Sequence, residues 1–241
     1  MAKADQAQLL RFRGSPRAIE ALIPMGMPEA AERRLAVDLE VEAERKPPIV
    51  VHPIPMGASA TRLRLVLPES TPPGTYKGTV QVGDARYPIE AQVDAYRHLR
   101  LSPSRLSLEA AAGSEVEVEL TVVNGGNVTC EVGRAYALGL FDKDGLNRGT
   151  AAAFQEDAPR GQERVGRLMD EFAEGYGGFL RMKVEEGAGP LDPGELRNLK
   201  LKLKMPDRLK AGRNYFGTWS FHNLAYLVTV RATGGEAGEV Q

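Results

Sequence analysis

Apolar and polar residues alternate along four stretches of the chain. In residues 35–41 and 61–67, leucine or valine recurs at every second position, with charged residues at most positions between them. Residues 115–120 alternate glutamate with valine or leucine, and residues 199–204 alternate lysine with leucine. Because successive side chains of a strand point to opposite faces, each stretch predicts a β-strand with one buried face.

One longer segment occurs twice. Residues 67–79 match residues 205–218, with one extra residue before the tyrosine of the second copy. Each copy has a proline that ends one strand, a glycine that permits a tight turn, and a tyrosine, Tyr76 or Tyr215, that begins the next strand. A tyrosine corner occupies this place in a sandwich. The repeat therefore predicts an all-β fold of two tandem immunoglobulin-like β-sandwiches, at residues 1–97 and 98–241.

The charged outer faces predict which strands are neighbours. In an immunoglobulin-like sandwich the second strand pairs antiparallel with the fifth. In the second half this rule sets three glutamates beside three lysines: Glu115, Glu117 and Glu119 beside Lys204, Lys202 and Lys200. In the first half it sets acidic residues beside two arginines: Asp38, Glu40 and Glu42 beside Arg62 and Arg64. We interpret both sets as cross-strand charge ladders that define register. Docking of an acidic partner on the lysine row is the alternative.

Two segments resemble a known class of module. Residues 101–129 read LSPSRLSLEAAAGSEVEVELTVVNGGNVT, and residues 72–78 read PPGTYKG. They resemble bacterial immunoglobulin-like β-sandwich modules of the type found in α-galactosidase-associated and cell-surface proteins. That resemblance implies a sandwich fold and a spacer or interaction role outside the cytoplasm. The chain departs from the pattern because it shows no leader and carries a large insertion.

The insertion interrupts the second half, where residues 139–178 do not have the pattern of strands. After Pro159, apolar residues recur at helical spacing, and glycines follow at positions 175, 177 and 178. We therefore expect a helical insertion at about residues 140–178. Its apolar stripe must be buried, either against the chain's own sandwiches or by a partner. The candidate partner-binding residues are Leu168, Met169, Phe172 and Tyr176.

Composition and motifs do not indicate an enzyme. The 241 residues include 31 basic and 32 acidic side chains, for a formal net charge of −1, so we expect no nucleic-acid partner. The three histidines, His52, His98 and His222, have no serine or cysteine beside them in a nucleophile motif. Phosphate-binding and dinucleotide-binding fingerprints are absent. We expect no catalytic activity and no cofactor.

The single cysteine and the chain start bear on the compartment. Cys130 shares one strand face with Val128 and Val132, which predicts a buried core residue, and a lone cysteine cannot form an intramolecular disulfide. No apolar leader, transmembrane run or lipid anchor is visible. The protein would be cytoplasmic if the chain is complete, and periplasmic or extracellular if a leader was removed.

Two features keep a ligand-binding alternative open. Residues 23–27 and 52–57 both contain Pro-Met-Gly, the second beside His52, and thioether with imidazole ligands would suit copper. We favour loops or ordinary packing for these methionines. Trp219 would suit a sugar if it were exposed, but its strand position predicts a core residue.

The sequence therefore predicts a non-catalytic protein–protein interaction or scaffold protein, for example an accessory subunit of a larger assembly. Its partner would be another protein or a protein complex. An extracytoplasmic module that binds sugar or copper is the alternative. The apolar stripe of the helical insertion is the feature on which the first hypothesis depends.

Overall fold

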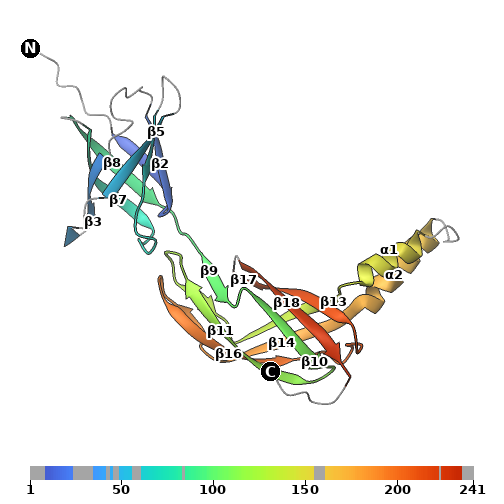
Figure 1. The fold of residues 1–241 in the computed structure, drawn as a ribbon. Coiled ribbons are helices and arrows are strands. Elements are labelled where there is room, and N and C mark those ends of the chain that lie inside the picture. Colours follow the sequence, from blue (N-terminus) through green and yellow to red (C-terminus); the bar gives the residue numbers. More distant parts are fainter. Residues whose placement is uncertain are drawn as a thin grey trace, which may run out of the picture. The chain divides into compact units, whose positions relative to one another are not determined.

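The computed structural model describes most of the chain: residues 9–23, 35–41, 44–45, 49–55, 61–82, 85–154, 161–222 and 224–234. The chain folds into two compact units, Met1–Arg97 with Gly125–Thr129, and His98–Asn124 with Cys130–Gln241. Each unit is built mainly of strands (Figure 1). Over the described residues, no helix is both long and apolar enough to cross a membrane.

The described residues of the first unit form an eight-stranded sheet. Its strands are β1 (Leu10–Ser15), β2 (Ala18–Ile23), β3 (Leu35–Val41), β4 (Glu44–Arg45), β5 (Ile49–Pro55), β6 (Thr61–Leu65), β7 (Gly74–Val82) and β8 (Ala85–Val93). Their order is β4-β3-β5-β6-β2-β1-β8-β7, and β3 also pairs with β7. β1 runs parallel to β8, whereas β2 and β6 are antiparallel.

Buried and exposed side chains alternate along β6, as predicted from the sequence. Leu63 and Leu65 are completely buried, while Arg62 and Arg64, which alternate with them, are partly exposed. Phe12 of β1 and Ile89 of β8 pack into the same core. The prediction of a half-buried strand at residues 61–67 is therefore confirmed, although the strand itself ends at Leu65.

The predicted pairing of Asp38 and Glu40 with Arg62 and Arg64 is wrong, and Glu42 lies outside the described residues. β3 pairs with β4, β5 and β7, whereas β6 pairs with β2 and β5. The acidic residue opposite Arg64 is Glu20 of β2, and Glu20 also forms an ion pair with Arg62 at 3.5 Å. The error arose because β2 precedes β3, so residues 35–41 form the third strand of the unit rather than the second.

The second unit also contains an eight-stranded sheet, with a separate pair of short strands. Its strands are β9 (Leu99–Ser102), β10 (Arg105–Ala111), β11 (Glu115–Asn124), β12 (Cys130–Val132), β13 (Ala135–Asp142), β14 (Tyr176–Glu186), β15 (Gly189–Leu191), β16 (Leu196–Lys204), β17 (Asn214–Phe221) and β18 (Leu224–Thr233). The order of the large sheet is β10-β18-β17-β13-β14-β16-β11-β9, and β12 pairs with β15.

The two units share one pairing scheme. In each, an early strand runs parallel to the last strand, as β1 with β8 and β10 with β18. β2 pairs with β6 as β11 does with β16, and β3 pairs with β7 as β13 does with β17. An immunoglobulin-like sandwich likewise pairs its second strand with its fifth and its third with its sixth. The fold is therefore all-β and immunoglobulin-like in its pairing. The domain boundary at residue 97 stays a prediction.

The register of β11 and β16 agrees with the predicted charge ladder residue by residue. Glu115 lies opposite Lys204, and the next two glutamates lie opposite Lys202 and Lys200. The shortest ion pair runs diagonally, from Lys202 Nζ to Glu115 Oε2 at 2.7 Å. A hydrogen bond from Lys202 lowers the pKa of Glu115. The leucines between the lysines are completely buried, so both faces of β16 define the same register.

Both predicted tyrosine corners form. The hydroxyl of Tyr76 donates to the carbonyl of Pro72 at 2.7 Å, and the hydroxyl of Tyr215 accepts from the backbone N–H of Lys210 at 3.0 Å. Each bond ties the start of a strand to the turn before it. Cys130 is buried, as predicted.

The insertion differs from its prediction at both ends. Residues 139–142 belong to β13 and residues 176–178 belong to β14, so the strand pattern extends into the range expected to lack it. Between these strands lie two helices, α1 (Gly145–Ala153) and α2 (Gln162–Gly175). Only the second had been expected from the apolar spacing. Its neighbour α1 carries four alanine and glycine residues in its last five and has no large apolar side chain after Leu146.

Candidate functional site

α1 and α2 pack against each other and extend from the ends of β13 and β14, as Figure 1 shows. The two helices meet closely at their base, where a Cβ atom added to Gly145 would lie 3.4 Å from the Cα atom of Gly175. Both glycines are buried. Small residues therefore permit the close approach of α1 and α2 beside the sheet.

A buried carboxylate holds the base of this helical pair. Asp142, at the end of β13, forms ion pairs through Oδ2 with Arg148 of α1 and with Arg213, the latter at 3.1 Å. Its Oδ1 accepts the backbone N–H of Asp144 at 3.1 Å. Glu174 of α2 lies 3.9 Å from Arg213. The network thus links both helices to the turn before β17.

The charge state of Asp142 follows from these contacts. Burial by itself raises the pKa of this carboxyl. Hydrogen bonds from Arg148 and from the backbone N–H of Asp144, together with the charge of Arg213, outweigh burial. The pKa of Asp142 is therefore lower than its usual value. The pKa of Glu174 is also lowered, first by its hydrogen bond from Lys210. Both carboxylates are therefore structural anions at neutral pH.

The predicted partner-binding residues do not all share one face. Met169 and Phe172 lie on α2 and are exposed, at 59% and 36%, and Leu168 is half-buried. Val165, one turn before Met169, is 59% exposed. Tyr176 instead begins β14 and is half-buried. Of the alternatives for the stripe, burial against its own sheet does not hold for these exposed residues, because α2 packs mainly on α1 and projects beyond the sheet.

A second apolar surface was not foreseen from the sequence. Phe141, Phe179 and Phe216 are 49%, 61% and 39% exposed on neighbouring strands, with half-buried Tyr176 between the first two. The ring of Tyr176 lies 5.4 Å from that of Phe141 and 5.8 Å from that of Phe179. Phe141 is directly opposite Phe216 in the register of β13 and β17. We call these four residues the aromatic patch.

One sequence signal could have revealed part of this patch. In the repeated segment, the residue after the corner tyrosine is Lys77 in the first copy and Phe216 in the second. Both side chains are exposed. A lysine replaced by phenylalanine at an outward strand position marks an apolar outer face.

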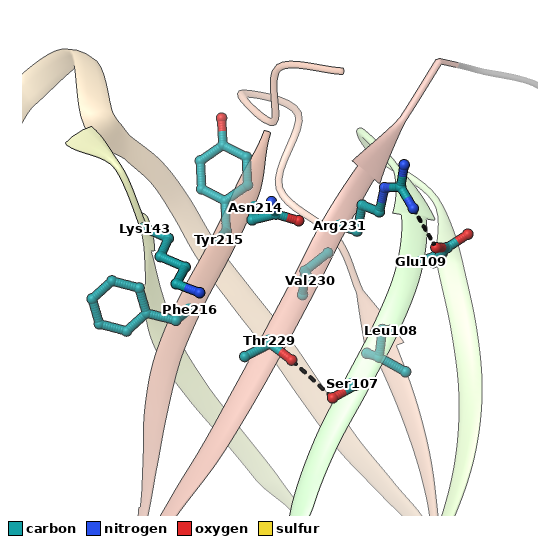
Figure 2. A pocket seen from close by; sticks show the side chains of 10 residues that line it. All are labelled: Ser107, Leu108, Glu109, Lys143, Asn214, Tyr215, Phe216, Thr229, Val230 and Arg231. Carbon is teal, nitrogen blue, oxygen red and sulfur yellow. Dashed lines mark hydrogen bonds and ion pairs between the residues drawn. The ribbon is translucent and has the colours of Figure 1, made fainter. Parts of the chain in front are cut away.

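A shallow groove of about 400 Å³ adjoins the patch and shares Phe216 with it (Figure 2). It crosses β10, β18 and β17, and two pairs of its polar side chains bond to each other. Thr229 Oγ1 donates to Ser107 Oγ at 3.0 Å, and Arg231 pairs with Glu109 at 3.3 Å. Neither histidine nor cysteine lines it. The groove therefore offers surface for binding, but no activated nucleophile.

The structure gives little support for the metal and sugar sites that the sequence left open. Most of both Pro-Met-Gly segments, and the side chain of His52, lie outside the described residues. Among the described side chains, no cluster of histidine, cysteine or carboxylate residues is arranged to hold a metal ion. Trp219 is 2% exposed in the core of the second unit, so its ring is not available to a sugar. His222, in the turn between β17 and β18, lies 2.7 Å from the carbonyl of Glu131.

Comparisons with known proteins assign no family to the chain and give only distant structural neighbours. No protein-family model matches the chain, and no curated protein matches it. Among solved structures, the PapD-like domain 7 of human CEP192 is 11% identical over 57% of this chain and 87% of its own, with a TM-score of 0.31. Domains 4 and 5 of the S-layer protein SbsC are 12% identical over 90% and 82%, with a TM-score of 0.30. An I-band fragment of titin is 9% identical over 95% and 62%, with a TM-score of 0.35. Because these scores are low, the fold assignment rests on the strand pairing.

Proposed function

We propose that this chain is a non-catalytic interaction protein and that the exposed face of α2 docks another protein. The observation that carries the proposal is the exposure of Val165, Met169 and Phe172 on one face of a helix that projects beyond its own sheet. Exposed apolar groups gathered on one surface are typical of interaction sites. An accessory or scaffold role in a larger assembly is the form of this function that we favour.

The base of the helical pair supports the same proposal. The ion pair of Asp142 with Arg148 attaches α1 to the sheet, and that of Glu174 with Arg213 attaches α2 to the turn before β17. A rigid support reduces the ordering that a surface must undergo when it binds. Arg164 lies over the ring of Phe154, 5.1 Å from its centre, so one more exposed aromatic residue is held in position on this helical pair. A helix presented in this way suits an apolar groove on the partner protein.

The test is a photo-crosslinking amino acid at position 169, with the same group at the exposed Glu119 of β11 as the control. We expect a partner that crosslinks from position 169 and not from position 119. The purified partner should then bind the full chain, with affinity reduced about tenfold by Phe172→Ala. Glu163→Ala, on the same helix, is the matched control. Equal affinity of the Phe172→Ala protein, with its fold verified by Trp219 fluorescence, would refute this docking face.

A further inference from the structure

We propose that the aromatic patch is a second binding surface, and that its ligand is an acidic segment of a partner protein with apolar side chains between its carboxylates. This inference rests on the proposed function, since both assign a protein ligand. It uses the outer face of β13, β14 and β17 instead of α2. The patch consists of Phe141, Tyr176, Phe179 and Phe216.

The first argument is the contrast between this face and the outer faces elsewhere in the unit. Outward positions of β11 and β16 carry the glutamate and lysine ladder with one exposed leucine, Leu196. Those of β10 and β18 carry the pair of Glu109 with Arg231 and one exposed leucine, Leu227. At the patch, three phenylalanines on three adjacent strands are exposed instead. Their continuity follows from the register of Phe141 with Phe216 and from the ring contacts of Tyr176. A contiguous apolar surface within a polar face is a binding surface.

The second argument is the charge beside the rings. Lys143 follows Phe141 by two positions, and Arg181 follows Phe179 by two positions on β14. Both residues are exposed, and neither forms an ion pair with any residue that the structure describes. Lys204 lies opposite Arg181 but is also 4.0 Å from Glu115, so Arg181 is the cation that this side of the patch offers to a ligand. Two unpaired cations beside an apolar surface attract carboxylates, and such complementarity contributes to specificity and to the association rate.

The ring geometry favours a peptide over a sugar. A polysaccharide stacks on aromatic faces that lie in one plane. The rings of Phe141 and Tyr176 are inclined by 46°, and those of Tyr176 and Phe179 by 84°. Phenylalanine also has no group that hydrogen-bonds a hydroxyl. Inclined rings leave spaces that accept the side chains of a peptide.

The charge of the surface also favours a peptide over nucleic acid. Single strands combine stacking on aromatic side chains with a groove of many cations along the phosphates. Here only Lys143 and Arg181 are unpaired beside the rings among the described residues, and Arg231 in the adjoining groove is neutralised by Glu109. The whole chain has a net charge of −1. Two cations suit the carboxylates of a short acidic segment.

The experiment titrates the isotope-labelled full chain by NMR with a soluble peptide that alternates phenylalanine and aspartate. Its counterpart with lysine in place of aspartate tests the charge. We expect the aspartate peptide to shift backbone signals of the patch strands, and the lysine peptide to bind about tenfold more weakly. Phe179→Ser and Arg181→Glu should each weaken binding of the aspartate peptide by a similar factor. Leu196→Ser and Arg208→Glu, which change exposed residues of the unit outside both proposed surfaces, should not.

Several outcomes would overturn the inference. Equal affinity for both peptides would show that Lys143 and Arg181 do not select the ligand. If the aspartate peptide shifts no backbone signals of the patch strands, the patch is not its binding site. A cello-oligosaccharide or oligothymidylate that shifts the patch signals when the aspartate peptide does not would assign another ligand class. By contrast, if Phe172→Ala abolishes partner binding but the aspartate peptide still binds the patch, both proposed surfaces are supported. Partner binding through α2 without any peptide binding at the patch refutes this inference alone.

Discussion

Asp142→Asn is the substitution that most directly tests how the helical pair is attached. The asparagine has the same shape but no charge, and its amide cannot accept from both arginines and from the N–H of Asp144 without turning a donor toward another donor. A hydrogen bond to a charged group contributes about 1.5–3 kcal/mol. The side chains of Arg148 and Arg213 are 44% and 29% exposed, so water compensates part of the loss. We expect the free energy of unfolding to fall by about 2 kcal/mol.

The assay is urea unfolding of the full chain at neutral pH, followed by fluorescence. Trp219 is the single tryptophan of the chain and lies in the core of the second unit, so its emission reports that unit. Asp170→Asn, which changes an exposed carboxylate on α2, is the control and should stay within about 0.5 kcal/mol of the unsubstituted protein. An Asp142→Asn protein as stable as this control would refute the reasoning.

The effect of Asp142→Asn on stability should also depend on pH, in a direction that follows from the pKa of Asp142. The pKa of Asp142 is lower in the folded state than in the unfolded state, so its contribution is complete above the unfolded pKa and is lost as pH falls through the folded pKa. The stability difference between the original protein and Asp142→Asn should therefore persist at neutral pH and shrink below about pH 4. A difference that grows in acid would contradict the assignment of Asp142 as a structural anion.

Three further substitutions test packing and pairing in the second unit. Leu201→Ala removes most of a fully buried side chain, and we expect a loss of about 2–5 kcal/mol in the same urea assay; a loss below about 1 kcal/mol would contradict the packing. Tyr215→Phe deletes the hydroxyl that accepts from Lys210 N–H, and we expect a loss of about 1 kcal/mol, whereas unchanged stability would contradict the corner. Lys202→Glu places a second carboxylate beside Glu115 and should lower Tm, by less at high salt because salt screens the repulsion. Adding Glu115→Lys restores opposite charges and should restore Tm, and failure of this reversal would exclude the ion pair.

The register of the second unit could be predicted because its determinants are local. Leucine at every second position of residues 199–204 defines the buried face, and a slip of one residue would bury the lysines. The acidic series of residues 115–119 then has one antiparallel arrangement that pairs every charge. Burial of Leu201 and the pairing of Glu117 with Lys202 agree with both parts of that reasoning.

The same rule failed in the first unit because one strand lacked the signal. Residues 18–23 read AIEALI, and their outward positions include Leu22, which is 64% exposed. With apolar residues on both faces, alternation is hidden, and the strand that pairs with β6 was missed. The acidic residues of β3 were then assigned to arginines whose actual neighbour is Glu20.

By itself, the sequence determined the strand faces, the corner tyrosines and the presence of an amphipathic helix. Each depends on the spacing of residues within one element, which the backbone geometry converts directly into a face. Only the tertiary structure decided that the face of Met169 and Phe172 stays exposed and that Phe141, Phe179 and Phe216 adjoin. Those facts depend on which strands become neighbours and on where α2 projects, and residues far apart in the chain contribute to both.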